Sequence, residues 1–181
     1  MTAKLEVERR DVVAHCPFPV YGLDSSWIGR RWIGGWSGRS GNIGRLTLAH
    51  GDVQDPTAPV VRVDTCPITA EPAHNFEPRV RRNMARSLVQ HLWNETAVYS
   101  EATPSTFRSD DPTRQWDATS LDVNGKPTEF SFLPGGAKWV ALGKVDDALL
   151  GISARNVELV QVRLTTIVNP MVYLQDEGGR R

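Results

Sequence analysis

The sequence predicts an α+β fold, in which a mainly antiparallel sheet of hairpins carries one principal amphipathic helix. Two observations predict it. β-Rich segments stand both before and after a single helical segment, and the later ones are joined by short turns rather than by crossover helices. The chain has 181 residues, of which 40% are hydrophobic and 23% are charged. It is therefore expected to form a single domain over residues 1–181 with a core of its own.

The N-terminal part, about residues 1–67, is expected to be β structure. Apolar and polar residues alternate over residues 4–13, and a glycine- and serine-rich tip separates two further β-rich runs. Residues 15–26 contain prolines and suggest an irregular connection. The expected strands cover residues 4–13, 30–38, 42–50 and 58–66.

One helix is expected over about residues 75–99. Asn75 is the expected N-cap, and Pro78 is tolerated in the first turn because no intrahelical N–H bond is lost there. Apolar residues spaced four apart form a stripe that should pack on the sheet. The stripe consists of Val80, Met84, Leu88 and Leu92.

The C-terminal part begins with a polar loop over about residues 100–115 and continues as a β-meander over about residues 116–170, before a frayed tail. Asn-Gly is a strong hairpin signal, because a type I′ turn needs positive φ at both central residues. The segment 158–168 also fits a helical stripe, but its β-branched residues favour a last strand. Tight turns are expected at residues 124–125, 135–136 and 146–148.

Charge and composition restrict the partners and the compartment. The formal net charge is +0, so attraction of the whole molecule to nucleic acid or to an anionic membrane is not expected. The first ten residues lack the apolar core of a secretion signal, and no apolar run approaches the ~20 residues that span a bilayer. A cytoplasmic protein is expected. Cys16 and Cys66 are then favoured as free buried thiols, with a disulfide between them left open.

No motif indicates a cofactor, a metal or a catalytic residue. The glycine-rich stretch over residues 27–52 carries Arg39 where a phosphate-binding loop needs Lys, and its Gly38-x-x-Gly41-x-x-Gly44 spacing lacks the strand-to-helix context of a dinucleotide site. The histidines and cysteines do not match known metal-ligand spacings, and no nucleophile motif is present. A non-enzymatic protein is favoured.

One candidate ligand site lies in this stretch. Trp32 and Trp36 share one face of an expected strand with Gly34 between them, which would leave a flat notch where a ring could stack, near Arg31 and His50. The alternative is that both rings fill the core beneath the helix, since tryptophan is highly buried on average.

Two charged segments are candidate protein-binding surfaces. The first half of the expected helix is basic, where the helix dipole disfavours cations. The following loop is acidic and could steer a basic partner. The candidate contacts are Arg79, Arg82 and Arg86 on the helix, and Glu101, Asp110, Asp111 and Asp117 in and after the loop.

The C-terminal half resembles a pattern in small uncharacterised bacterial proteins. It contains Asn-Gly-x-Pro-x-x-Phe over residues 124–130 and Gly-x-x-Trp-x-Ala over residues 136–141, and it follows a Pro-Val-Tyr-Gly-Leu segment over residues 19–23. The resemblance implies a β-rich fold and no particular activity. Some proteins of this kind are similar to immunity proteins, which bind and neutralise a toxin.

The first functional hypothesis is accordingly a protein-binding module, which could be an immunity-like inhibitor of a toxin or an enzyme. A small-molecule binder or hydrolase-like enzyme that uses the tryptophan notch is the second. A structural subunit of a larger assembly is the third.

Overall fold

The structure of the chain is a computed structural model, and it describes residues 18–27, 31–37, 43–52, 54–68, 73–93 and 112–167. For strand β2 it describes the backbone alone. The described strands are β1 (Val20–Leu23), β2 (Arg31–Ser37), β3 (Ile43–His50), β4 (Val60–Pro67), β5 (Asp117–Val123), β6 (Lys126–Gly135), β7 (Lys138–Val145), β8 (Ala148–Arg155) and β9 (Arg163–Ile167).

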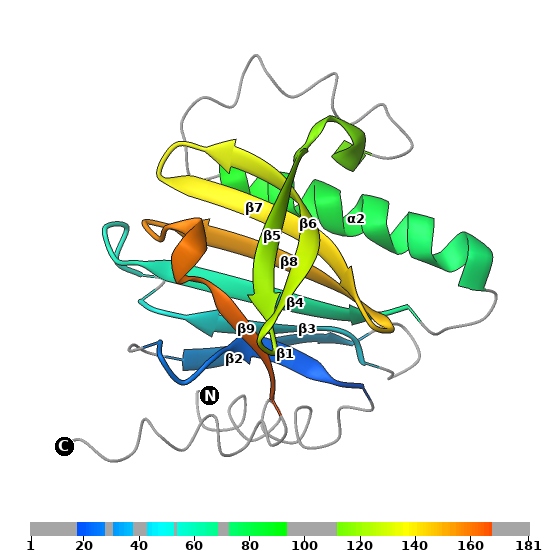
Figure 1. Cartoon of the computed structure of the whole chain (residues 1–181), viewed down its shortest axis with the longest axis horizontal. Coiled ribbons are helices and arrows are strands. Elements are labelled where there is room, and N and C mark those ends of the chain that lie inside the picture. The colour runs from blue at the N-terminus through cyan, green and yellow to red at the C-terminus, as the bar shows by residue number, and fades with distance from the viewer. Residues whose placement is uncertain are drawn as a thin grey trace.

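The described strands form one sheet of nine strands in the order β1-β9-β5-β6-β7-β8-β4-β3-β2 (Figure 1). Helix α2 (Ala73–Trp93) packs on β7 and β8 and touches the short 3-10 helix η1 (Pro112–Gln115). A second short 3-10 helix, η2 (Leu159–Gln161), precedes β9. The prediction of an α+β fold with one principal helix on a sheet is therefore confirmed.

The finer prediction, an antiparallel meander, needs correction because the sheet is mixed and nearly closed. Strands β5 and β9 run parallel, with Asp122 opposite Arg163 and Val123 opposite Leu164. After β8 the chain does not turn back in a hairpin. Residues 156–162, which include η2, instead carry it across the end of the sheet to the far side of β5 (Figure 1). A parallel pair needs such a crossover, whereas neighbouring antiparallel strands do not.

Side chains rather than a backbone ladder bring the two ends of the sheet together. Strand β1 pairs with β9 at one edge, yet it also contacts β3 and β4 near the other edge. The backbone N–H of Tyr21 donates to Oγ1 of Thr65 at 3.1 Å, and the N–H of Leu23 donates to Nε2 of His50 at 3.2 Å. We call this junction the seam. It leaves the sheet barrel-like, with an inner and an outer face.

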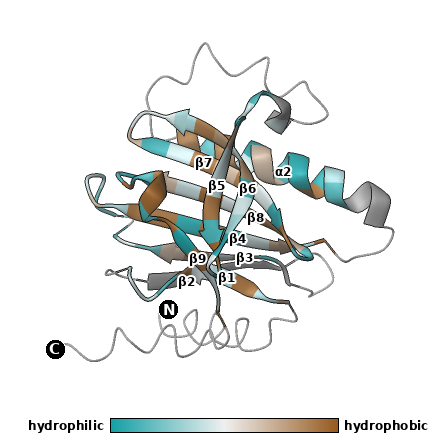
Figure 2. Ribbon diagram, in the orientation of Figure 1, coloured by the Kyte–Doolittle hydropathy of each residue, from teal (hydrophilic) through white to brown (hydrophobic). Residues whose placement is uncertain are grey.

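The two faces carry two separate cores. The inner core contains Phe130, Trp139 and Ile152, and it is closed off by Tyr21 and Leu23 of β1. The outer core lies between α2 and the sheet, where the predicted stripe residues Met84, Leu88 and Leu92 are buried against Val140, Leu142 and Leu149. Hydropathy accordingly alternates along α2 in Figure 2. None of the helices in the described part of the chain has the length and apolar character that crossing a bilayer requires.

Most of the predicted hairpins are confirmed. The turn between β5 and β6 is Asn124-Gly125, with φ of 54° and 77°, as a type I′ turn requires. The turn between β7 and β8 is at Asp146-Asp147, and the one between β6 and β7 is at Gly136-Ala137, one residue later than expected. Strands β2, β3 and β4 lie in the β-rich segments where the sequence predicted strands.

Three local predictions are wrong. Val20–Leu23 form the buried strand β1 rather than part of an irregular connection. Helix α2 begins at Ala73, so Asn75 lies inside it and is not its N-cap. The first residues of the last predicted strand form η2 instead. The strand expected over residues 4–13, the glycine-rich tip, the end of the helix beyond residue 93, most of the polar loop and the tail lie outside the described residues.

Candidate functional site

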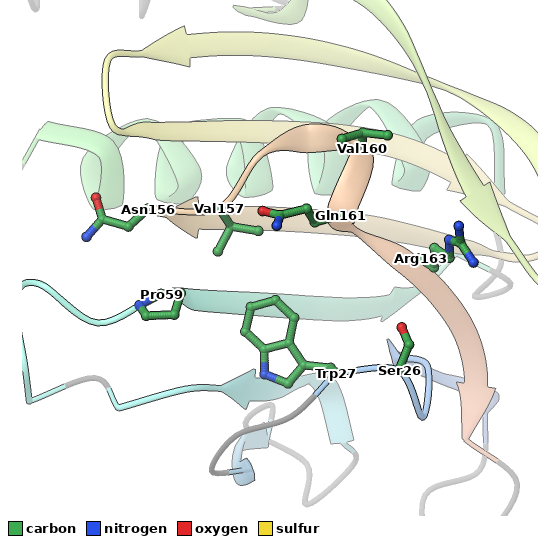
Figure 3. Close-up of a pocket in the computed structure, with 8 residues that line it drawn as sticks. All are labelled: Ser26, Trp27, Pro59, Asn156, Val157, Val160, Gln161 and Arg163. Carbon is green, nitrogen blue, oxygen red and sulfur yellow. The ribbon is translucent and has the colours of Figure 1, made fainter.

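The clearest candidate site is a cavity at the end of the barrel where the chain crosses from β8 to β9. It is open to solvent and has a volume of about 590 Å³. We call it the mouth pocket. Its lining comes from four segments: the turn after β1, the residue before β4, the crossover with η2, and the start of β9 (Figure 3). The lining residues are Ser26, Trp27, Pro59, Asn156, Val157, Val160, Gln161 and Arg163.

One arginine fixes the loop that leads into the pocket at Pro59. The guanidinium of Arg155, at the end of β8, donates to the backbone carbonyls of Asp55 at 2.6 Å, Asp52 at 3.3 Å and Ala58 at 3.4 Å. Asn156 donates from its side-chain amide to the carbonyl of Thr57 at 3.0 Å. Hydrogen bonds from a charged donor are stronger than neutral ones, so this loop is held firmly against the end of β8.

The opposite wall of the pocket is also tied down. The indole N–H of the core residue Trp139 donates to the carbonyl of Val157 at 2.7 Å. The side-chain Oε1 of Gln161 accepts from the backbone N–H of Glu158 at 2.9 Å. The backbone N–H of Gln161 donates to the carbonyl of Glu158 at 3.0 Å. The backbone of the crossover is thus fixed at several points.

Trp27 supplies the largest apolar surface of the pocket. It is half-buried, packs against the inner core and meets the ring of His50 edge-on, with centroids 6.3 Å apart and planes at 75°. Its indole N–H is buried and has no hydrogen-bond partner among the described residues. A buried donor without a partner is uncommon, and this one can donate to an acceptor atom of a ligand or a water. Trp27 therefore offers both a flat face and an unused donor.

Charge in the pocket comes from Arg163. Its guanidinium is exposed, and within the described part of the chain it makes neither a hydrogen bond nor an ion pair. The neighbouring carboxylate belongs to Asp24, whose backbone N–H donates to the carbonyl of Arg163 at 3.0 Å. Asp24 Oδ1 is occupied locally, because it accepts from the backbone N–H of Ser26 at 3.0 Å and from the Ser26 hydroxyl.

The ligand site predicted from the sequence lies elsewhere, on β2 and β3. In the register of the two strands Arg31 stands opposite His50, Trp32 opposite Ala49 and Trp36 opposite Arg45. Side chains alternate along a strand, so Arg31 and His50 occupy different positions in the alternation from the two tryptophans. The β2 side chains lie outside the described residues, and stacking on Trp32 and Trp36 stays a prediction.

The structure describes His50, and its contacts indicate a structural role. It is fully buried, its Nε2 accepts the N–H of Leu23 at the seam, and its ring meets Trp27. An acceptor Nε2 requires the neutral ring with the proton on Nδ1. His50 thus supports Trp27 from behind the mouth pocket.

The charged residues predicted to bind a partner are only partly placed. Arg79 and Arg86 are exposed on α2, Arg82 is half-buried on the same helix, and Asp117 is exposed at the start of β5. The other acidic candidates, Glu101, Asp110 and Asp111, lie outside the described residues. A protein interface built from these groups stays a prediction.

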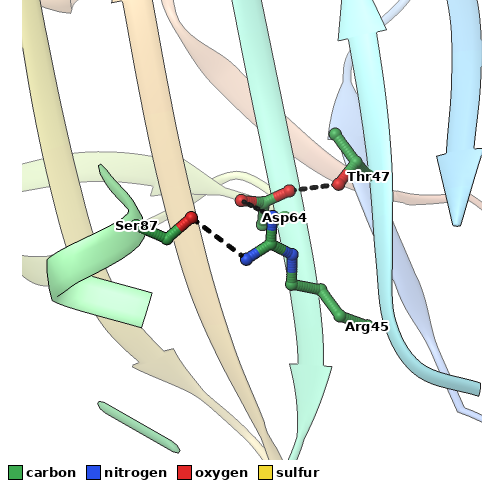
Figure 4. Close-up of polar contacts among 4 residues, drawn as sticks. All are labelled: Arg45, Thr47, Asp64 and Ser87. Carbon is green, nitrogen blue, oxygen red and sulfur yellow. Dashed lines mark hydrogen bonds and ion pairs between the residues drawn. The ribbon is translucent and has the colours of Figure 1, made fainter. Parts of the chain in front are cut away.

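A second polar cluster lies on the outer face, between the sheet and α2 (Figure 4). The buried carboxylate of Asp64 accepts from the Thr47 hydroxyl and pairs with Arg45, whose guanidinium approaches it to 3.5 Å. Arg45 also donates to Oγ of Ser87 on α2 at 3.4 Å. The cluster links β3 and β4 to the helix, and its partners satisfy one another, so we interpret it as structural.

Cys66 lies next to this cluster, where its thiol is buried, as the sequence predicted, and donates to the backbone carbonyl of Pro67 at 3.9 Å. Burial raises the pKa of the Cys66 thiol to about 11, with Asp64 also raising it and Arg45 opposing them. Such a thiol is a poor nucleophile near neutral pH. Within the described ranges, no group of three or more His, Cys, Asp and Glu side chains is arranged to hold a metal ion.

The sequence did not identify the mouth pocket because its lining residues are scattered over four segments. The local signal in the sequence was Asn156, which follows the strand-like segment that ends at Arg155. Asparagine tolerates positive φ, and the φ of Asn156 is 55°. Comparisons of the chain with protein-family models, with curated proteins and with solved structures found no match.

Proposed function

We propose that the protein is a non-enzymatic binding protein that holds a small, partly apolar molecule in the mouth pocket. The observation that carries this proposal is the fixed shape of the pocket, whose two walls are held by Arg155 on one side and by Trp139 on the other. A preformed cavity binds its ligand without the cost of ordering the walls first.

The mixture of side chains supports the same conclusion. Trp27, Pro59, Val157 and Val160 offer apolar contact, while Ser26, Asn156, Gln161 and Arg163 can orient a polar group. Binding pockets for small molecules commonly combine a mainly apolar wall with a few polar groups. Ser26 supplies the one hydroxyl among the described lining residues, and it donates to Asp24 rather than to a histidine base, so we propose binding without catalysis.

The test uses N-phenyl-1-naphthylamine, a neutral, flat, fluorescent probe that brightens in apolar sites. We expect saturable binding that Trp27→Ala weakens by roughly tenfold, since that side chain provides the main stacking surface. Val160→Glu should also weaken binding without disturbing the core, because Val160 is 78% exposed at the rim.

The matched control is Gln115→Glu, which adds the same charge at an exposed position on η1, away from the pocket. It should bind the probe as the unaltered chain does. Urea unfolding of each variant distinguishes loss of the pocket from loss of the fold. If the probe does not bind saturably, or if it binds equally to all variants, the mouth pocket is not the site.

Protein binding, which the sequence and its resemblance to immunity-like proteins suggested, is the second candidate. It is supported by Val160, a large apolar side chain left exposed at the rim, and by the exposed charges Arg79, Arg86 and Asp117. Reversing the charge of Asp117 together with Glu101, Asp110 and Asp111 should weaken capture of a basic partner and reduce its salt dependence. Capture that is unchanged by these substitutions would eliminate that interface.

A further inference from the structure

The charge and shape of the mouth pocket indicate the class of ligand, given the small-molecule binding proposed above. Of the lining residues, Arg163 alone carries a formal charge, and the other seven are neutral. The Arg163 guanidinium is unpaired among the residues that the structure describes, so its donors remain available. Guanidinium donors match carboxylate, sulfonate and phosphate oxygens in geometry as well as charge.

The apolar surface lies beside this cation. Figure 3 shows the rings of Trp27 and the side chain of Val157 facing each other in the middle of the pocket, with Ser26 and Arg163 toward one end and Asn156 toward the other. A ligand that lies along the pocket would therefore meet a flat aromatic face at its middle and a cation at one end. Apolar and cationic contacts are then separated along one axis, which also fixes the direction of the ligand.

We infer that the ligand is an organic anion, a small molecule that carries one carboxylate or similar acid group on a flat apolar body. The acid group pairs with Arg163 near the Ser26 end, and the body packs between Trp27 and Val157. Asp24 lies next to this end and weakens the positive field. Both hydrogen bonds to its carboxylate come from Ser26, so it does not neutralise Arg163 by pairing.

The test compares two probes of nearly the same shape, the anionic 1-naphthaleneacetate and the neutral 1-naphthaleneacetamide, by ligand-observed NMR titration. We expect the carboxylate to bind more tightly than the amide. Arg163→Gln should weaken carboxylate binding by roughly fivefold, the size typical of an exposed ion pair, and should leave amide binding unchanged. Raising sodium chloride from about 50 mM to about 500 mM should weaken the carboxylate selectively.

Three further variants sharpen this test. Arg163→Lys keeps the charge and should retain much of the preference for the carboxylate. Asp24→Asn keeps an acceptor for Ser26 while removing the negative charge, and it should strengthen carboxylate binding. Arg79→Gln removes one exposed positive charge on α2 and should change neither affinity.

The outcomes separate the two proposals. If both probes bind equally and Arg163→Gln changes neither, the mouth pocket binds small molecules but the inference of an anionic ligand is wrong. If neither probe binds to the folded chain, the proposed function fails and the inference fails with it. A preference for the carboxylate that persists in Arg163→Gln would place the anion at another group and also overturn the inference.

Discussion

Cys66 shows at the level of a single residue how burial links pH to stability. Burial raises the pKa of this thiol to about 11 from its ordinary value of 9.0, so the folded state holds the proton after the unfolded state has lost it. This contribution to stability is complete below pH 9 and is lost as pH rises through 9 toward 11. The shift corresponds to a loss on the order of 2–3 kcal/mol in the free energy of unfolding.

The measurement is urea unfolding of the unaltered chain and of Cys66→Ala at several pH values between about 8 and about 11. Other ionisable groups, including Tyr21, also contribute to the pH dependence of stability. The pKa of Tyr21 is raised by burial and by its contacts with Asp146. Only the difference between the two proteins is therefore attributed to Cys66. Equal alkaline slopes in the two proteins would contradict the prediction.

The candidate site was difficult to predict because residue type does not specify the role of a side chain. The sequence proposed His50 for ligand stacking, but its Nε2 accepts the N–H of Leu23 in a fully buried position. Arg155 and Arg163 look alike in the sequence, yet one holds three backbone carbonyls and the other lines the pocket. These roles depend on contacts between segments far apart in the chain.

At the level of elements, the seam depends on hydrogen bonds from backbone N–H groups of β1 to side chains of β3 and β4. Thr65 is fully buried and accepts the N–H of Tyr21. Thr65→Val preserves the shape of the side chain and removes the acceptor, leaving a buried N–H without its partner. We expect a loss of about 1–3 kcal/mol in the free energy of unfolding.

Urea unfolding measures this loss, and amide hydrogen exchange of Tyr21 should become faster in the same variant. Thr128→Val is the matched control, since the hydroxyl of that half-buried threonine on β6 donates to the carbonyl of Lys126 at 3.3 Å and, among the described residues, accepts no bond from β1. Its effect should stay within about 0.5 kcal/mol. Similar values for the two variants would show that the seam does not depend on Thr65.

The elements that the sequence predicted best are those formed by neighbours in the chain. The Asn124-Gly125 turn and the stripe of α2 are local patterns, and both were identified. Strand β1 was missed because it is four residues long, follows Pro19 and is buried on both faces, so it shows no alternation. Its partners, β9 on one side and Thr65 and His50 on the other, are distant in sequence.

At the scale of the whole molecule, β7 and β8 serve two cores at once, one on each face. A glycine in each strand marks a close approach. A Cβ at Gly143 would come within 2.5 Å of the Phe130 ring, while a Cβ at Gly151 would meet the end of the flexible Met84 side chain at 2.9 Å. Gly143→Ala should therefore cost about 1–3 kcal/mol of stability because the ring must shift, whereas Gly151→Ala should be nearly neutral.

Thermal and urea unfolding of the two variants, side by side, check this expectation. Each is the control for the other, since both replace a buried strand glycine by alanine. Equal losses would mean that the two faces are packed with the same rigidity.

Closure of the sheet is the feature of the whole molecule that the sequence did not predict. Turn signals specify that consecutive strands pair, but they do not specify how far a sheet curls. Curling here follows from the crossover of residues 156–162, which places β9 beside β5 and so brings β1 round to β3 and β4. No local sequence pattern predicts this path, because β1 and β9, which pair with each other, are far apart in the sequence.

Arg155 has a consequence for how this protein could change over generations. It holds the loop before β4 through carbonyl groups, which every amino acid possesses, rather than through particular side chains. Substitutions in that loop that keep its path leave the anchor intact. Evolution or a protein engineer can therefore vary the sequence next to the pocket while the scaffold stays the same. New binding preferences can then arise without a change of fold.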